Sequence, residues 1–373
     1  MRREAEGSSI SRRTFLKTTI VGAAAVALPA VFIPRRAAAA YDPGQRVHPN
    51  ISPLRVVGIH DPGMTTGQQV NNSWADQEKL VKPELIAANL DRLACALAEE
   101  KDEETAWKAV FVAPPRKAWS EVVVAIKTNN IAEQHTRSPV MAKVCHVLTD
   151  VIGVKGENIH IYDACHGGNL ASGTPFAGLP EGVTIENQWG GSSTEAPVPL
   201  PWKDGKATSR CVGPLARGEV DVLVNIALCK AHGPEFGGVT LSMKNHFGTF
   251  SPGPGHRADG TDYLIAINKS EAVLGRTDSG GKVLFPRQQL CLIDALWVSE
   301  AGPSGNPSHQ PNRLFMGTCG PVLDYQVATK FRRDEMGWAI NGDVTKRFLS
   351  EFGFSADELP EEGRIIDAMK QTA

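Results

Sequence analysis

The sequence contains seven cysteines but no pair of them spaced as C-x-x-C. Zinc ribbons and ferredoxin-type iron–sulfur sites are built on such pairs, so neither is expected here. The Walker and dinucleotide-binding fingerprints are also missing, as is the G-x-S-x-G elbow of serine hydrolases. None of these motif-defined sites is therefore expected in this chain.

The N-terminal apolar run, from Thr18 to Ile33, is shorter than the roughly 18 residues that a membrane-spanning helix requires. It follows Arg12 and Arg13 in a Ser-Arg-Arg-Thr-Phe-Leu-Lys pattern and precedes three alanines at 38–40. This arrangement predicts a twin-arginine signal peptide over residues 1–40. We therefore expect the twin-arginine export machinery to deliver the protein to the periplasm or another extracytoplasmic space. Membrane contact is expected only through this segment, if it is not cleaved.

The mature chain has little basic character. Residues 1–40 hold seven basic and two acidic residues, so their removal changes the net charge from −2 to −7. Nucleic acids bind to basic faces, so they are not expected as partners. The remaining chain is long enough to bury a large core without disulfides, as folding in the reducing cytoplasm before export would require.

Apolar runs alternate with helical patterns after a Pro/Gly-rich linker at residues 41–53. Predicted strands lie within 54–60, 121–130, 158–168, 220–232, 288–305 and 313–334, and helical periodicity marks 83–100 and 138–153. This alternation predicts an α/β domain over 54–350 with a mostly parallel sheet and helices on both faces. Residues 169–210, rich in Gly, Pro and Ser, predict a long insertion or lid, and 351–373 a C-terminal tail.

Polar side chains recur where the predicted strands end. They include Lys127 and Asn129, then Asp163, then Lys230 and His232, and finally Asp294 with Glu300. Ligands of open parallel sheets bind beyond the carboxyl ends of the strands. The pattern therefore predicts a small-molecule site at this edge of the sheet.

Two glycines, Gly237 and Gly238, precede a predicted helix in the stretch "CKAHGPEFGGVTLSMKNHFG". Backbone N–H groups at a helix start bind anions, and glycine lets a ligand approach closely. Lys230 and Lys244 would add positive charge beside them. The stretch therefore favours an anionic ligand, with a carboxylate or a phosphate group.

The same edge would bring soft metal ligands together if the strands that carry them are neighbours. These residues are Cys165, His166, Cys229 and Cys319, and thiolate and imidazole groups suit a transition metal. The alternative is that each cysteine is a buried, inert thiol. The sequence specifies no other cofactor.

Three of the four residues expected to do chemistry, Lys230, His232 and Lys244, lie close to one another in sequence. His232 is a general base or metal ligand in this hypothesis, Lys230 and Lys244 hold charge on the ligand, and Asp294 supplies a carboxylate. The expected ligand-binding residues are Lys127, Asn129, Gly237, Gly238, Asn245, Glu300 and Asp324.

The stretch 221–250 resembles the signature of the family filed as domain of unknown function 362. That signature is an apolar strand, Lys-x-His and then Val-Thr-x-x-x-Lys-Asn-x-x-Gly. The matching residues are Lys230, His232, Val239, Thr240, Lys244, Asn245 and Gly248. Weaker matches are Lys127 and Asn129, then Asp294, Glu300, Gly302 and Pro303, and finally Asp324, so the resemblance covers about 54 to 330.

The resemblance implies positions but no reaction, since no generally established activity is known for this family. Many relatives carry an appended iron–sulfur module with C-x-x-C-x-x-C spacing, and this chain lacks it. Two hypotheses stay open. The protein is an exported enzyme acting on an anionic small molecule or metal complex, or it is a non-catalytic periplasmic binding or cofactor-handling protein.

Overall fold

Eight strands form the central sheet, in the order β14-β1-β13-β12-β9-β2-β5-β6. The computed structural model describes residues 47–163, 176–186, 189, 195–199, 208–256, 260–359 and 365–371. The strands of this sheet are β1 (Val56–His60), β2 (Val124–Lys127), β5 (Ile159–Tyr162), β6 (Thr184–Glu186), β9 (Val222–Leu228), β12 (Gln288–Ala295), β13 (Arg313–Gly317) and β14 (Ile366–Asp367). Every neighbouring pair is parallel except the two that β13 makes, with β1 and with β12. The prediction of a mostly parallel sheet is confirmed.

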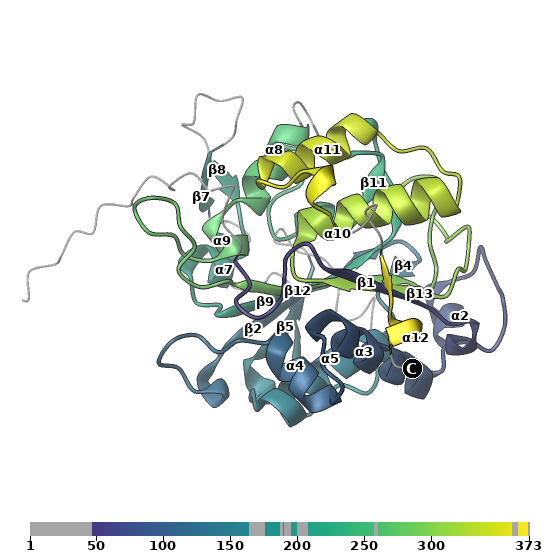
Figure 1. Cartoon of the computed structure of the whole chain (residues 1–373), viewed down its shortest axis with the longest axis horizontal. Helices are drawn as coiled ribbons and strands as arrows, with labels where there is room; N and C mark the ends of the chain where they lie inside the picture. Colours follow the sequence, from purple (N-terminus) through teal and green to yellow (C-terminus); the bar gives the residue numbers. More distant parts are fainter. Residues whose placement is uncertain are drawn as a thin grey trace, which may run out of the picture. The chain divides into compact units, whose positions relative to one another are not determined.

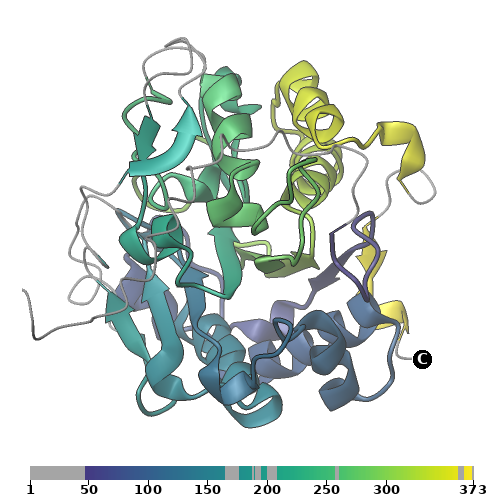
Figure 2. The ribbon, with the colours of Figure 1, turned by 90° about the vertical axis from the view of Figure 1, so that its left-hand side faces the viewer.

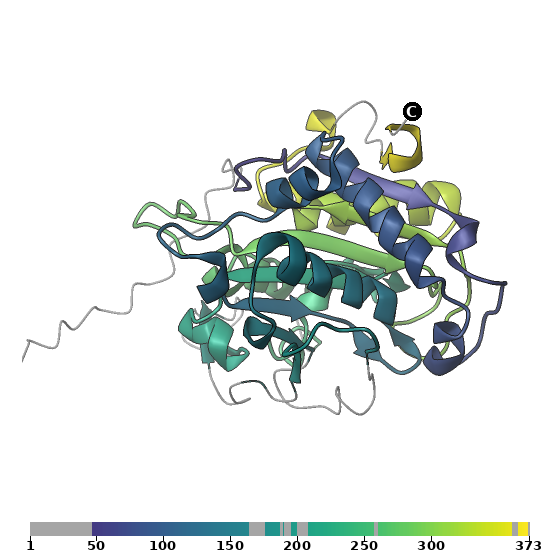
Figure 3. The ribbon, with the colours of Figure 1, turned by 90° about the horizontal axis from the view of Figure 1, so that it is seen from below.

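Helices cover both faces of the sheet (Figure 1). One face carries α3 (Pro83–Ala98), α4 (Glu103–Val110) and α5 (Ser138–His146), which cross the strands in Figure 3. The other carries α8 (Gly260–Asn268), α10 (Gly320–Gln326) and α11 (Gly342–Glu351), and Figure 2 shows the sheet between the two layers. The remaining helices are α2 (Trp74–Glu78), α7 (Gly213–Arg217), α9 (Glu271–Leu274) and α12 (Ala368–Gln371). Among the described residues, no helix has the length and apolar character that crossing a bilayer needs.

Short helical turns and two-stranded ribbons complete the structure. The turns are η1 (Pro62–Met64), η2 (Trp119–Glu121), η4 (Gly156–Asn158), η5 (Pro234–Phe236), η6 (Lys244–His246) and η8 (Ala356–Glu358). Two π-helices, η3 (Val147–Ile152) and η7 (Val327–Glu335), directly continue α5 and α10. The ribbons pair β3 (Asn130–Ile131) with β4 (Gln134–His135), β7 (Glu195–Pro199) with β8 (Thr208–Arg210), and β10 (Lys230–Ala231) with β11 (Val239–Thr240).

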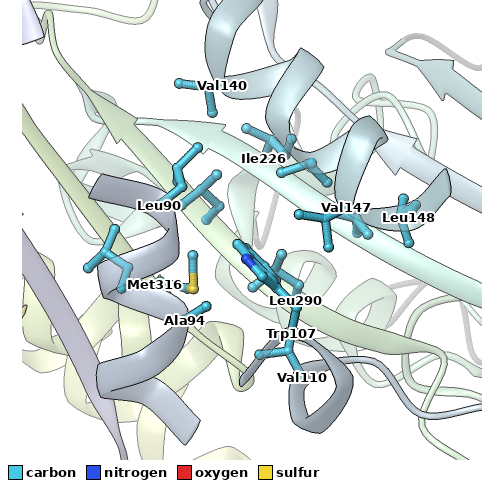
Figure 4. Close-up of a cluster of buried hydrophobic side chains, with 14 of the residues drawn as sticks. Leu90, Ala94, Trp107, Val110, Val140, Val147, Leu148, Ile226, Leu290 and Met316 are labelled. Atoms are coloured by element: carbon cyan, nitrogen blue, oxygen red, sulfur yellow. The ribbon is translucent and has the colours of Figure 1, made fainter. Parts of the chain in front are cut away.

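Strand alternation divides the core into two layers. Val222, Val224 and Ile226 of β9 point toward α3, α4 and α5, where they join the cluster drawn in Figure 4 with Leu90 and Trp107. The intervening residues of β9 point toward the α8, α10 and α11 layer. Because successive side chains of a strand face opposite sides, the face on which a polar residue emerges is fixed by its position in the strand.

The region 169–210 contains more regular structure than its composition predicts. Strand β6 extends the central sheet by pairing with β5 in parallel, and β7 pairs with β8. The described parts of the predicted insertion therefore include short strands, one of which belongs to the central sheet. Residues 169–175, 187–188, 190–194 and 200–207 lie outside the described residues, as do the predicted signal peptide and residues 41–46 of the linker.

The C-terminal residues belong to the same fold. Strand β14 pairs in parallel with β1, with Val57 opposite Ile366, so the described part of the predicted tail adds a strand to the sheet.

Candidate functional site

The site is built where β2 and β9 leave the sheet side by side. Lys127 ends β2, opposite Asn225 of β9, and β9 continues through Cys229 into the β10–β11 hairpin. In that hairpin Lys230 pairs with Thr240. The chain then folds back as η6, which places Asn245 beside the two strands. The structure thus brings together Lys127, Lys230 and Asn245, three of the residues that the sequence singles out.

The two hairpin glycines serve the turn itself. Gly237 and Gly238 have φ values of 79° and 78°, in the left-handed region that favours glycine. A Cβ on Gly238 would lie 3.3 Å from Cα of Ile340, so the turn also packs closely on the chain before α11. The expected helix after these glycines is wrong, because β11 follows them. Their N–H groups donate to Pro234 O and Gly233 O, so neither is free to bind an anion.

A chain of three amide side chains runs through the site, and its orientation is fixed by backbone carbonyls. Asn225 Nδ2 donates to Ser242 O at 2.8 Å, so Asn225 Oδ1 is the atom that accepts from Asn245 Nδ2 at 2.8 Å. Asn245 Nδ2 also donates to Ile226 O at 3.1 Å, so Asn245 Oδ1 accepts from Asn129 Nδ2 at 2.9 Å. A carbonyl can only accept a hydrogen bond, and this settles each amide in turn. Asn129 is the last amide of this series, and its Oδ1 is therefore the atom that can accept a further hydrogen bond.

Lys230 meets that oxygen. Its Nζ donates to Asn129 Oδ1 at 2.7 Å, and the side chain is fully buried. No carboxylate lies within 4 Å of this ammonium among the described residues. Burial lowers the pKa of Lys230, the charge of Asp163 opposes this effect, and the positive charges of Lys127 and Arg137 add to it, so that the pKa is about 7.

Lys127 has a carboxylate partner. Its Nζ donates to Asp163 Oδ1 and to Thr128 O, each at 2.5 Å, and lies 3.4 Å from Asn245 Oδ1. Gly248 closes the other side of this pair. A Cβ at Gly248 would lie 2.2 Å from Asp163 O and 2.9 Å from Lys127 Cε, and its φ is 121°. Only glycine fits this position without displacing the ion pair.

Lys244 is held by aromatic rings. Its Nζ lies 3.5 Å from the centroid of Phe247 and 4.7 Å from that of Phe236. The residue is 7 % exposed, and within the described part of the chain no hydrogen-bond acceptor or carboxylate contacts its ammonium. Burial lowers the pKa of Lys244 well below its usual value, and Lys230 and Lys127 lower it further against Glu235.

His232 and Lys244 both contact the ring of Phe236. The His232 ring packs edge-on against Phe236 and is stacked on exposed His256 with centroids 5.4 Å apart. Its Nδ1 accepts from Gly233 N at 2.8 Å, so in the neutral ring Nε2 carries the proton. Burial lowers the pKa of His232 to about 3, and the charges of Lys244, His256 and Lys230 add to this effect. This geometry fits a hydrogen-bond donor better than the predicted general base.

Asp294 emerges on the opposite face of the sheet from Lys127. Its side chain lies on the same face of β12 as those of Leu290 and Leu292. Its two oxygens accept hydrogen bonds from Arg137 N at 2.9 Å and from Leu296 N at 3.1 Å. It therefore fixes the start of α5 rather than joining the lysines. Strand parity could have revealed this from the sequence alone.

The other two predicted carboxylates form no ion pair with the lysines among the described residues. Asp324, on α10, accepts from Ser242 N and Met243 N, both at 2.8 Å, and so anchors the loop before η6. Burial raises the pKa of Asp324 to about 7, although these N–H groups oppose the shift. Glu300 is exposed in the loop after β12. Asp324 lines a small cavity together with Lys244, but within the described structure neither Asp324 nor Glu300 makes a hydrogen bond or an ion pair with Lys230 or Lys244.

The predicted convergence of Cys229 and Cys319 is wrong. Cys229 follows Leu228, which pairs with Asp294 near the end of β12, whereas Cys319 follows Gly317, which pairs with Cys291 near its start. The reversed direction of β13 thus separates the two thiols by about 20 Å, at roughly 3.3 Å per strand residue. Cys165 and His166 lie outside the described residues, and within these no group of three His, Cys, Asp or Glu side chains could hold a metal.

Two residues of the site were missed by sequence reasoning. Arg137 is buried before α5, with its guanidinium 4.9 Å from the centroid of Trp297, and its charge reaches Lys230. Asn225 was missed although a polar amide inside the apolar run "VLVNIAL" is itself a signal. Such a buried amide needs partners, and here Asn245 of the Lys-Asn motif is one of them.

The segments that build the site lie within a region that matches a known protein family. Residues 124–329, more than half of the chain, match the family described as "Domain of unknown function (DUF362)". The chain belongs to this family. Residues 9–29 match the twin-arginine translocation signal sequence, so the protein is exported from the cytoplasm by that route. No curated protein and no solved structure matches the chain.

Proposed function

We propose that this exported protein binds an anionic small molecule at the site formed by Lys230, Lys244 and His232. The proposal rests on the surroundings of the Lys244 ammonium, which is held by aromatic rings. The ammonium of a largely buried side chain loses much of its hydration, and with no acceptor among the described residues this is costly, so a bound anion would offset that cost. Aromatic rings alone offset part of it, since a cation–π contact contributes about 0.5–2 kcal/mol.

The neighbouring groups support a ligand with a carboxylate or phosphate. Lys230 adds a second cation that contacts only a neutral amide oxygen, and His232 offers the Nε2 proton as a donor. Asp163 is the one carboxylate in contact with the lysines among the described residues, and it is already bonded to Lys127. Positive charge therefore exceeds its local compensation, as at sites built for anions.

A metal complex is a weaker alternative. Cys229 is fully buried, and its sulfur lies 3.8 Å from Nη1 of Arg332. Burial raises the pKa of the Cys229 thiol, an effect that Arg332 opposes, so the thiol is protonated at neutral pH and a poor ligand. An enzyme would differ from a binding protein in transforming the bound anion, and the lysines would be the groups to do so.

Titration of the mature protein with acetate, formate, citrate and phosphate tests the proposal, with calorimetry and thermal unfolding as readouts. We expect at least one anion to bind, and Lys244→Met to weaken its affinity about tenfold or more, equivalent to about 1.4 kcal/mol. The same variant should unfold at a higher temperature in the absence of anion, because a buried charge is removed. A purely structural lysine would give the opposite change in stability.

Lys269→Met is the matched control. Lys269 also lies over an aromatic ring, at 5.6 Å from Phe352, but it has the carboxylate of Glu351 at 2.8 Å. This variant should bind the anion as the wild type does. Failure of every anion in the panel to bind, or equal loss of binding in both variants, would overturn the proposal.

A further inference from the structure

Lys230 is placed as a nucleophilic amine rather than as a simple counter-charge. Its one hydrogen bond in the described structure goes to Asn129 Oδ1, and the amide chain through Asn245 and Asn225 prevents Asn129 from turning. A lysine meant to stay charged in a buried site is normally paired with a carboxylate. Here the nearest partner is neutral, and other cations stand beside it.

Several titratable groups face Lys230 from the elements packed around it. They are Lys127 and Asp163 at the ends of β2 and β5, His135 and Arg137 before α5, His232 on the same hairpin, and Lys244 on η6. Asp163 is the single acid in this set, and it already forms a hydrogen-bonded ion pair with Lys127. Desolvation and neighbouring cations are the two means by which proteins keep a lysine unprotonated and reactive at neutral pH.

Building on the proposed function, we propose that the Lys230 amine forms an imine with the carbonyl carbon of an α-oxo carboxylate bound at this site. Lys244 would hold the carboxylate of the ligand, because it lies near enough to Lys230 for the two positive charges to repel each other. The nitrogen bonds to the carbonyl carbon while the C–O bond breaks. The oxygen leaves as water with the two amine protons, so the step needs no oxidant, reductant or metal.

The step agrees with the pKa of about 7 that burial gives Lys230. At neutral pH about half of such an amine is unprotonated, against less than about one part in a thousand for an exposed lysine. Asn129 would keep the nitrogen oriented without protonating it, because an amide oxygen has no proton to give.

Trapping with glyoxylate, which carries an aldehyde beside a carboxylate, tests the inference. The mature protein is incubated with glyoxylate and cyanoborohydride at about pH 7, and the reduced adduct is located by peptide mass mapping. We expect Lys230 to react at least about tenfold faster than Lys79 and Lys108, which are well exposed. Acetate, which has the carboxylate but no carbonyl, should protect Lys230.

Two variants sharpen the result. Asn129→Asp places a carboxylate beside Lys230 in nearly the same volume, so it should raise the pKa of the amine and slow its labelling about tenfold or more at pH 7. Labelling of the variant should recover at higher pH. Lys230→Arg retains positive charge and should give no adduct at this position.

The outcomes separate the two proposals. If acetate or another anion binds but Lys230 reacts no faster than Lys79, the imine is overturned and the anion site stands. If Lys230 reacts fast but Asn129→Asp does not slow it, the assigned role of the amide chain is overturned. If neither binding nor selective labelling occurs, both proposals fall. Because the rate comparison is made within the wild-type protein, it remains decisive even if a variant does not fold.

Discussion

Lys230 Nζ lies 2.7 Å from Asn129 Oδ1, a neutral acceptor at the end of an amide chain that begins inside β9. A carboxylate at the same position would have made a buried salt bridge. The amide instead satisfies the geometry of the lysine without compensating its charge. The site therefore contains an uncompensated positive potential, and its energetic consequences can be measured without knowing the ligand.

The stability of the protein should depend on pH through Lys230. Its pKa is about 7 in the folded chain, against about 10.4 in an unfolded one. Between these values the unfolded state binds more protons, so the free energy of unfolding should rise as the pH increases from about 7 to about 10. The contribution is on the order of 4 kcal/mol, and urea denaturation across this range measures it.

The variant Lys230→Met should show a smaller rise, because Lys230 no longer titrates and only the lowered pKa of Lys244 still contributes. Lys269→Met keeps Lys230 and should retain the slope of the wild type, although it too removes a lysine beside an aromatic ring. Equal slopes in wild type and Lys230→Met would show that the amine is not perturbed in the folded protein.

Replacing Gly248 should damage the site through the backbone. In Gly248→Ala the new Cβ would meet Asp163 O at 2.2 Å, and φ of 121° is strained for alanine. We expect a loss of roughly 2–4 kcal/mol in the free energy of unfolding, together with displacement of the Lys127–Asp163 pair. Gly67→Ala is the control, since nothing lies within 4 Å of the position that a Cβ would take there, and stability should hardly change. A well-tolerated Gly248→Ala would show that the turn relaxes and that glycine is not required there.

The amide chain should contribute more to stability than one surface hydrogen bond. Asn225→Leu removes the donor to Ser242 O and the acceptor for Asn245 Nδ2, both buried, while conserving volume approximately. The orphaned partners should cost about 1–3 kcal/mol of stability. Asn50→Leu is the comparison, because that exposed amide donates only to Ala109 O, and its effect should stay within about 0.5 kcal/mol. Denaturation of both variants decides the point, and equal effects would argue against a cooperative chain.

The sheet was predictable because its strands are continuous apolar runs that alternate with helical periods. The ends of β2 and β9 could be singled out by the same reasoning, and the structure brings Lys127, Lys230 and Asn245 together there. These inferences need only the period of the side chains and the direction of parallel strands.

The errors came from features that residue types do not encode locally. β13 runs antiparallel to β12, and this reversal carries Cys319 to the far edge of the sheet from Cys229. The segment after Gly238 has helical spacing at Val239 and Met243, yet it pairs as a strand because β10 offers a partner. Tertiary pairing outweighs local propensity in such short segments.

The sequence predicts a catalytic role for Asp294, whereas its hydrogen bonds in the structure indicate that it stabilises the fold. In Asp294→Asn one of the two oxygens that accept from Arg137 N and Leu296 N becomes an amide nitrogen, which leaves a buried N–H without an acceptor. We expect a loss of about 1–3 kcal/mol in stability with anion affinity changed less than about twofold. Glu300→Gln, at an exposed carboxylate of the neighbouring loop, should change neither quantity. Calorimetry beside denaturation separates the two roles. If affinity falls while stability is retained, Asp294 contacts the ligand and the assignment from the sequence is restored.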